Sequence, residues 1–82
     1  MKVTSVVCGT YQHYKGKFYE VIGVAKHSET LEELVVYYCL YPNKKGQLWV
    51  RPLKMFTESV IIDGKQVLRF KLIDRKNLEK NE

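Results

Sequence analysis

Cysteine is scarce in this chain, and long apolar runs and internal repeats are missing. The only two cysteines, Cys8 and Cys39, form no CxxC pair, so their spacing gives little support to a structural zinc site. Both lie among apolar or aromatic neighbours, where a thiol is commonly a small buried hydrophobe. No apolar run is long enough for a signal peptide or a membrane span. We therefore expect a cytoplasmic protein with reduced thiols and no membrane partner.

A concentrated block of one charge is also missing. The formal net charge of +5 permits contact with nucleic acid or another anionic surface, but it is ordinary for a small soluble domain. The basic residues are spread along the chain, and the only adjacent pairs are Lys44-Lys45 and Arg75-Lys76. The charge therefore leaves nucleic-acid binding open without requiring it.

The residues that are present favour one small β domain. A length of 82 residues suffices for a single domain, and the apolar share of 45% and charged share of 28% are ordinary. Six of the ten aromatic residues are tyrosines, which we expect at the rim of the core with their hydroxyls in water. Residues 1–74 form the expected domain, and residues 75–82 form a polar tail.

Turn residues divide the domain into short strands. Gly16 favours a tight turn, and Asp63-Gly64 is the preferred pair for a type I′ hairpin turn. Residues 53–56 follow a proline and fit one 3₁₀ turn that plugs an open end of the sheet. The predicted strands are residues 9–14, 18–25, 34–41, 47–51, 59–62 and 66–73. This pattern predicts an all-β fold, with an SH3-like open barrel as first choice and an OB-like barrel as second.

The third and fourth predicted strands carry an aromatic face. Tyr37 and Tyr41 fall on the same side of residues 34–41 because side chains alternate along a strand. A pairing of Tyr41 with Gln47 would set the register. Tyr37 would then lie opposite Arg51, with their Cβ atoms roughly 5 Å apart.

The same register places Cys39 opposite Trp49. We expect Trp49 and Arg51 on an outward face, because Leu48 and Val50 already supply an inward face for that strand. Exposed tryptophan and arginine are enriched at binding hot spots. The structural alternative is that Trp49 fills the core and Arg51 pairs with a glutamate. The glutamates considered for that pairing are Glu20 and Glu33.

A polar loop between the second and third predicted strands holds His27, Ser28, Glu29 and Thr30. Titratable and hydroxyl groups held by a rigid scaffold are typical of functional loops, and histidine titrates near neutral pH. The structural alternative is that Glu29 and Ser28 satisfy amide groups of the loop and that His27 covers a tyrosine. Thr30 and Glu33 also have capping-box spacing, which would give the loop a turn of helix. Both interpretations stay open at this point.

Several segments match a known family in order and spacing. They are residues 11–16, 19–25, 27–30, 35–37, 40–41, 49–53 and 55–56. Together they resemble a bacterial family called domain of unknown function 1653, over about residues 9–70. The chain departs from the family at Gln12, where a basic residue is usual, and at Leu68, where proline is common. The resemblance implies a cytoplasmic bacterial protein and supplies no established activity, cofactor or catalytic residue.

The sequence favours a non-enzymatic binding module for a peptide segment or a small polar or anionic group. Its groove would combine the polar loop, the first turn and the aromatic strand face. Arg51 and His27 would donate hydrogen bonds, and the aromatic rings would supply apolar area. The predicted binding residues are His13, Lys15, His27, Ser28, Glu29, Thr30, Tyr37, Trp49 and Arg51.

Two alternatives belong to other classes of function. Aromatic rings with scattered lysine and arginine also suit RNA or single-stranded DNA. A small enzyme that uses the His27 loop is the third hypothesis, although so small a barrel seldom encloses a deep pocket. No catalytic residue, metal ligand or cofactor is predicted, and the sequence leaves the oligomeric state open.

Overall fold

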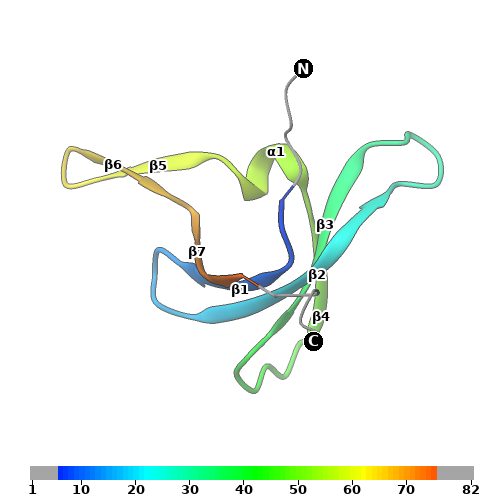
Figure 1. Cartoon of the computed structure of the whole chain (residues 1–82), viewed down its shortest axis with the longest axis horizontal. Coiled ribbons are helices and arrows are strands. Elements are labelled where there is room, and N and C mark those ends of the chain that lie inside the picture. Colours follow the sequence, from blue (N-terminus) through cyan, green and yellow to red (C-terminus); the bar gives the residue numbers. More distant parts are fainter. Residues whose placement is uncertain (1–5, 76–82) are drawn as a thin grey trace, which may run out of the picture.

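The computed structural model describes residues 6–75 and places most of them in antiparallel strands, of which five form one curled sheet (Figure 1). Five strands form this sheet in the order β4-β3-β2-β1-β7, and a separate hairpin pairs β5 with β6. A four-residue helix, α1, connects β4 to the hairpin. The elements are β1 (Gly9–His13), β2 (Phe18–Lys26), β3 (Glu33–Cys39), β4 (Leu48–Pro52), α1 (Leu53–Phe56), β5 (Ser59–Ile62), β6 (Lys65–Leu68) and β7 (Phe70–Arg75).

The order of the strands determines which loops lie near one another. Strands β1 to β4 form a meander, and β7 returns to pair with the other side of β1, so β4 and β7 are the edges of the sheet. In Figure 1 the β2–β3 hairpin and the β5–β6 hairpin project to opposite sides, and the β3–β4 loop lies at the bottom. The two loops that flank β3 therefore lie at opposite ends of that strand.

Alternation along β3 and β4 builds the concave face of the sheet. Tyr37 and Cys39 of β3 are buried, and Trp49 and Arg51 of β4 share their face, with Tyr37 opposite Trp49. The prediction that this aromatic face points outward is therefore wrong. Large rings fill the inside of a curled sheet better than aliphatic side chains, because the core of so small a domain has few residues with which to fill it.

The opposite face of β4 is open instead. Leu48 is 62% exposed and Val50 is 55% exposed, so the prediction that these two residues supply the inward face is also wrong. Strand β4 is an edge strand, and its convex side therefore lacks the neighbours that would bury aliphatic side chains.

The β3–β4 register differs from the predicted one by two residues. Gln47 closes the loop: its carbonyl oxygen accepts from the Cys39 amide at 2.9 Å, and its side-chain amide donates to the carbonyl oxygens of Cys39 and Tyr41 at 3.1 and 3.2 Å. Trp49 consequently lies opposite Tyr37 rather than Cys39. A slip of two residues returns every side chain to its original face, so Tyr37, Trp49 and Arg51 still lie together.

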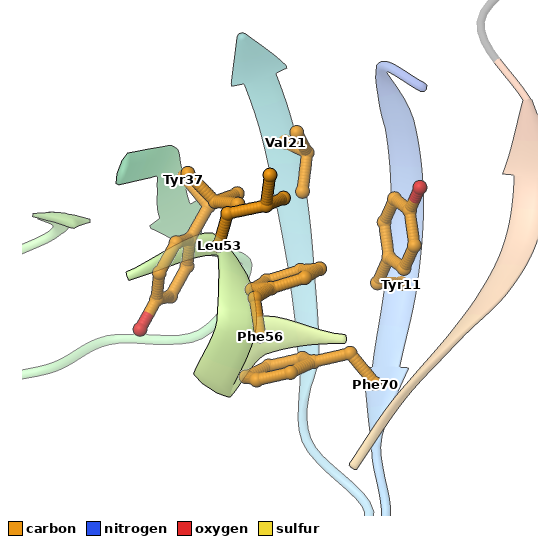
Figure 2. Packing of buried hydrophobic residues seen from close by; sticks show 7 residues of the cluster. Tyr11, Val21, Tyr37, Leu53, Phe56 and Phe70 are labelled. Carbon is orange, nitrogen blue, oxygen red and sulfur yellow. The ribbon is translucent and has the colours of Figure 1, made fainter. Parts of the chain in front are cut away.

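A cluster of aromatic rings fills the space under α1. Phe56 stacks on Phe70 of β7 with ring centroids 4.1 Å apart and planes inclined by 3°. Tyr11 meets Phe56 edge-on at 5.4 Å. Figure 2 shows these rings with Leu53 and Val21, so that α1 covers the concave face through its apolar side chains.

Helix α1 occupies the position predicted for a plug. The Thr57 amide donates to the Leu53 carbonyl oxygen at 3.1 Å, which closes an α turn rather than the expected 3₁₀ turn. Phe56 is 1% exposed and fills the core, whereas Met55 is 43% exposed and faces outward. Phe56 therefore plugs the open end of the sheet, and Met55 does not.

The last hairpin has the predicted turn but not the predicted strand. Asp63 and Gly64 both have positive φ, 52° and 80°, as a type I′ turn requires. The expected single strand over residues 66–73 breaks at Arg69. There the Arg69 amide donates to the Glu58 carbonyl oxygen, and the Arg69 carbonyl accepts from the Tyr14 amide. The chain thus leaves β5 and joins β1, which leaves Leu68 exposed and buries Phe70.

The prediction of a small all-β fold with an open sheet is confirmed, and the assignment to SH3-like barrels in particular stays a prediction. Arg75, expected in the tail, is the last residue of β7, and the rest of the predicted tail, 76–82, lies outside the described residues. Within residues 6–75 no helix has the length and apolar character needed to cross a bilayer.

Candidate functional site

A hollow of about 200 Å³ opens on the concave face where β2, β3 and β4 meet the β3–β4 loop. Its lining residues are Tyr19, Tyr37, Cys39, Tyr41, Asn43, Trp49 and Arg51. We call this hollow the Arg51 pocket. Four aromatic rings and one cation line it, and none of its lining side chains is acidic.

Arg51 is the charged group of this pocket. Its guanidinium carbon lies 5.5 Å from the centroid of the Phe70 ring, which supports the planar cation from one side. Its Nε atom is buried and has no hydrogen-bond partner. Among residues 6–75 the single ion pair is Arg69 with Glu58, so the predicted alternative of an Arg51–glutamate pair does not form. A half-buried guanidinium thus keeps donors available for an external acceptor.

The tyrosines of the pocket are held by one another. The hydroxyls of Tyr19 and Tyr41 share a hydrogen bond of 2.9 Å, and Tyr19 meets Tyr37 and Tyr41 edge-on at 5.4 and 5.6 Å. This hydrogen bond, followed by burial, raises the pKa of Tyr41 above its ordinary value, so its phenol stays neutral near pH 7. The Lys17 ammonium lies 4.5 Å from the centroid of the Tyr41 ring and adds a second cation beside the pocket.

The β3–β4 loop fixes the other wall. The Trp49 indole donates to the Gly46 carbonyl oxygen at 2.9 Å, and the Asn43 side-chain amide lies 3.6 Å from the Cys39 sulfur. Gly46 has φ of 135°, a region that favours glycine and allows the loop to turn back toward the indole. The loop therefore orients Trp49 without using a charged residue.

His13 lies next to the Arg51 pocket but lines a different hollow. Its ring contacts Phe70 edge-on at 4.9 Å and Tyr19 at 6.4 Å. Burial lowers the pKa of His13, and the positive charges of Arg51, Arg69 and Lys15 lower it further. Every charge that shifts this histidine is a cation, so the concave side of the molecule has a positive potential.

A larger hollow of about 470 Å³ lies between β1, β7 and the projecting hairpin. Its lining residues are Gln12, His13, Tyr14, Ile62, Val67, Leu68 and Lys71. Lys15 borders this side of the molecule, since its amide donates to the His13 Nδ1 atom at 3.1 Å and its ammonium lies 5.9 Å from the Tyr14 ring. His13 and Lys15 therefore lie beside the Arg51 pocket rather than in it.

The predicted His27 loop has a structural role. The His27 Nδ1 atom accepts from the amides of Glu29 and Thr30 at 3.1 and 3.3 Å, and the Thr30 hydroxyl accepts from the Glu32 amide at 3.2 Å. The Leu31 amide donates to the His27 carbonyl oxygen, with Leu31 at φ of 65°. The side chains of His27 and Thr30 thus satisfy the amides of a tight exposed loop, a role that the structural alternative gave to Ser28 and Glu29.

The capping box does not form, because Glu33 begins β3 and residues 28–30 form a turn without a helix. Ser28 and Glu29 are exposed in that turn. His27 follows β2 six residues after Val21, the partner of Tyr37, a distance of about 20 Å along an extended strand. The expected shared groove is therefore wrong: the structure unites Tyr37, Trp49 and Arg51 and leaves residues 27–30 at the far end of β3.

Sequence reasoning missed several residues of the pocket. Tyr19 lies opposite Cys39, so a correct β2–β3 register alone would have placed its ring there. Tyr41 had already been assigned to the face of Tyr37, but its partner hydroxyl had not been identified. Asn43 and Lys17 reach the site through turn geometry, which residue type does not reveal.

The described part of the chain brings no three histidine, cysteine or acidic side chains together in the way a metal ion needs. Cys8 and Cys39 are both free thiols, the first half-buried and the second buried. Cys39 is thus a small wall residue of the Arg51 pocket.

Comparison with known proteins places the chain in a family. Residues 9–72 match the family described as "Protein of unknown function (DUF1653)". The fold is similar to the crystal structure of a member of this family from Bordetella bronchiseptica, with 32% identity and a TM-score of 0.81, covering 90% of this chain and 95% of that chain. Comparison with proteins of curated function gave no match. The resemblance expected from the sequence is confirmed, and the chain belongs to the DUF1653 family, whose function is unknown.

Proposed function

We propose that this protein is a binding module whose Arg51 pocket takes a carboxylate or a similar small anionic group. One observation carries the proposal: the Arg51 guanidinium has no acidic partner among residues 6–75, and its buried Nε atom has no hydrogen-bond acceptor. A hydrogen bond between a guanidinium and an anion contributes on the order of 1.5–3 kcal/mol, and no acidic side chain among residues 6–75 competes for Arg51.

The chemistry of the pocket supports an anion over a cation or an apolar ligand. A guanidinium presents donors in a planar fork that matches a carboxylate in bidentate geometry. The lining has no negative charge that would compete, and Lys17 adds a further positive charge beside Tyr41. Tyr37 and Trp49 supply apolar area, as expected from the sequence, and partial burial strengthens the charged hydrogen bonds.

An NMR titration with sodium acetate and inorganic phosphate tests this function. We expect saturable shifts of the amides around Arg51, Trp49 and Tyr41, with acetate more effective because it matches the planar fork. The Arg51→Gln variant is expected to lose these shifts, and Lys65→Gln, which removes one positive charge from the exposed hairpin, is the matched control. Equal shifts in the two variants, or shifts that map only to the hairpin, would refute the proposal.

The alternative classes gain less from this geometry. Base stacking needs exposed ring faces, and Tyr37 is only 5% exposed, so the Arg51 pocket offers single-stranded nucleic acid little stacking area; the exposed rings of Tyr14 and Phe18 do not line this pocket. A nucleic-acid ligand would show affinity that falls steeply with salt. The enzyme hypothesis depended on His27, whose Nδ1 atom is occupied by loop amides far from either hollow.

The cellular setting is part of the same proposal. A bacterial cytoplasm fits two free thiols and the Bordetella origin of the similar structure. Detection of the protein in a soluble cytoplasmic fraction, with both thiols open to alkylation after unfolding, tests this setting.

A further inference from the structure

The edge strand β4 is an unpaired template for another strand. Among residues 6–75 it pairs with β3 on one side and with no strand on the other, so one row of its main-chain donors and acceptors is unused by the described sheet. Natural proteins usually protect such an edge, because it invites pairing with another chain. Here the edge runs directly beside the Arg51 pocket, since Trp49 and Arg51 belong to both.

The two faces of β4 differ in chemistry. Leu48 and Val50 point to the convex side and are 62% and 55% exposed. Trp49 and Arg51 point to the concave side. A strand added to this edge would therefore meet Leu48 and Val50 on its convex face and Trp49 and Arg51 on its concave face.

The segment that contains β4 is basic, and the nearest acidic residues along the chain, Glu33 and Glu58, flank it. Residues 34–57 contain four basic residues and no acidic residue. Lys44 and Lys45 are exposed in the loop that precedes β4, Arg51 lies within the strand, and Lys54 is exposed just after it in α1. Cations thus flank the free edge at both ends as well as in its middle.

We infer that β4 is the docking edge for an extended acidic peptide segment of another protein, which adds a strand and places one carboxylate on Arg51. This inference rests on the proposed function, because the Arg51 pocket supplies its anion site. Main-chain hydrogen bonds would provide much of the affinity, and alternate side chains would provide specificity. The expected sequence pattern is an acidic residue at every second position with apolar residues between.

The same charges argue against a second copy of this chain as the occupant. Antiparallel pairing of β4 with its own copy would bring two sets of these four cations together, and like charges across an interface are unfavourable. The exposed Leu48 and Val50 argue against nucleic acid, whose backbone neither continues a β ladder nor covers aliphatic side chains. An acidic peptide satisfies the edge, the apolar face and the charge together.

The experiment uses the full chain and a blocked pentapeptide that alternates glutamate and valine. In an NMR titration we expect shifts and slowed amide exchange along residues 48–51, with additional shifts at Tyr41. A peptide with glutamine in place of glutamate should bind at least about tenfold more weakly, because it lacks the charge for Arg51.

Two exposed edge residues provide matched variants. Val50→Glu places a negative charge on the convex side of β4 and should weaken the acidic peptide at least about tenfold. Ile73→Glu makes the same change at an exposed position of β7, the other edge strand, and should leave the affinity within about twofold. Folding of each variant is checked by its NMR spectrum before the titration.

Each outcome decides the inference. Peptide binding at β4 that depends on Val50 and on the glutamates supports it. Saturable acetate shifts at Arg51 without peptide binding overturn this inference and leave the proposed function standing. Absence of acetate binding together with equal affinity for both peptides overturns the proposed function as well. Self-association through β4 in sedimentation, or displacement of the peptide by oligothymidine, assigns the edge to another occupant and overturns the inference.

Discussion

At the scale of single residues, the proposed function depends on Arg51, whose positive charge also acts on His13. The guanidinium lies against Phe70, and the imidazole lies against the other side of the same aromatic cluster. No acidic residue is among the groups that shift His13, so the positive charge of Arg51 acts on it without compensation. The pKa of His13 is therefore expected to change with the charge in the Arg51 pocket.

Removal of Arg51 should raise the pKa of His13 toward its ordinary value of 6.5. In Arg51→Gln one of the cations that lower this pKa is gone, while the burial that lowers it most remains. A pH titration of the His13 ring signals by NMR measures the shift. Lys65→Gln is the control, and an equal rise in both variants would show that only the total charge matters.

The lowered pKa of His13 also determines how the free energy of unfolding changes with pH. Because the pKa of folded His13 lies below its unfolded value, the unfolded chain takes up this proton first as the pH falls. The contribution of His13 is intact above about pH 6.5 and is lost as the pH falls through the folded pKa. Urea unfolding at stepped pH should show this loss in the wild type and a smaller loss in Arg51→Gln. An identical acid dependence would contradict the role given to Arg51.

At the scale of elements, α1 and the two β hairpins have separate roles. Helix α1 supplies Leu53 and Phe56 to the core, the β3–β4 hairpin forms the pocket, and the β2–β3 hairpin ends in a self-contained polar loop. Phe56 of α1 and His27 of the β2–β3 loop do not line the Arg51 pocket, so substitutions of these two residues test stability separately from the proposed binding.

Phe56→Ala should destabilise the protein by about 3–5 kcal/mol, because it removes a fully buried ring and leaves a cavity against Phe70. Met55→Ala, its neighbour in the same helix, removes an exposed side chain and should cost less than about 1 kcal/mol. Urea denaturation measures both. Similar losses in the two variants would mean that α1 does not cover the sheet as described. Should Phe56→Ala fail to fold, Phe56→Leu provides the smaller comparison.

His27→Ala should lower the free energy of unfolding by about 1 kcal/mol and leave acetate binding unchanged, because it removes an acceptor for two loop amides. His27→Asn should recover part of this loss, since an asparagine side chain can accept from amides two residues ahead. Urea denaturation and the acetate titration are the two measurements. A loss of binding in His27→Ala at preserved stability would return His27 to the site.

The local sequence pattern predicted the position of many strands and turns. It did not predict which side of β4 is buried or where the chain passes from one sheet to the other. The alternation in β3 correctly grouped Tyr37 with Cys39, and Asp63-Gly64 correctly predicted a type I′ turn. The inward and outward sides of β4 were reversed because apolar character alone does not reveal that β4 is an edge. The break at Arg69 was invisible because it depends on main-chain contacts with Glu58 and Tyr14, distant in sequence.

The site shows the same limit. Tyr37, Trp49 and Arg51 were predicted together, since a register slip of two residues preserves a face. His27 was included because residue type suggested chemistry, whereas its hydrogen bonds show that it organises its own loop. Whether two loops meet depends on which ends of a strand they occupy, and this follows from topology rather than from composition.

At the scale of the whole molecule, an open sheet places a positive, aromatic pocket against an unpaired edge. The sheet leaves β4 and β7 as separate edges, and the segment that contains β4, residues 34–57, has four basic residues and no acidic residue. A closed barrel would have used the main-chain groups of β4 internally and covered the approach to Arg51. Because the sheet is open, the edge of β4 and the Arg51 pocket are accessible to the proposed peptide.

The side-chain Nε–H signals of Arg51 and Arg69 in an NMR titration with sodium acetate provide the most direct measurement. Both Nε atoms are buried without a hydrogen-bond partner, but Arg69 already pairs with Glu58. We expect the Arg51 signal to shift saturably as a carboxylate binds, while the Arg69 signal stays in place. An unchanged Arg51 signal, or equal shifts of the two signals, would contradict an anion site at Arg51.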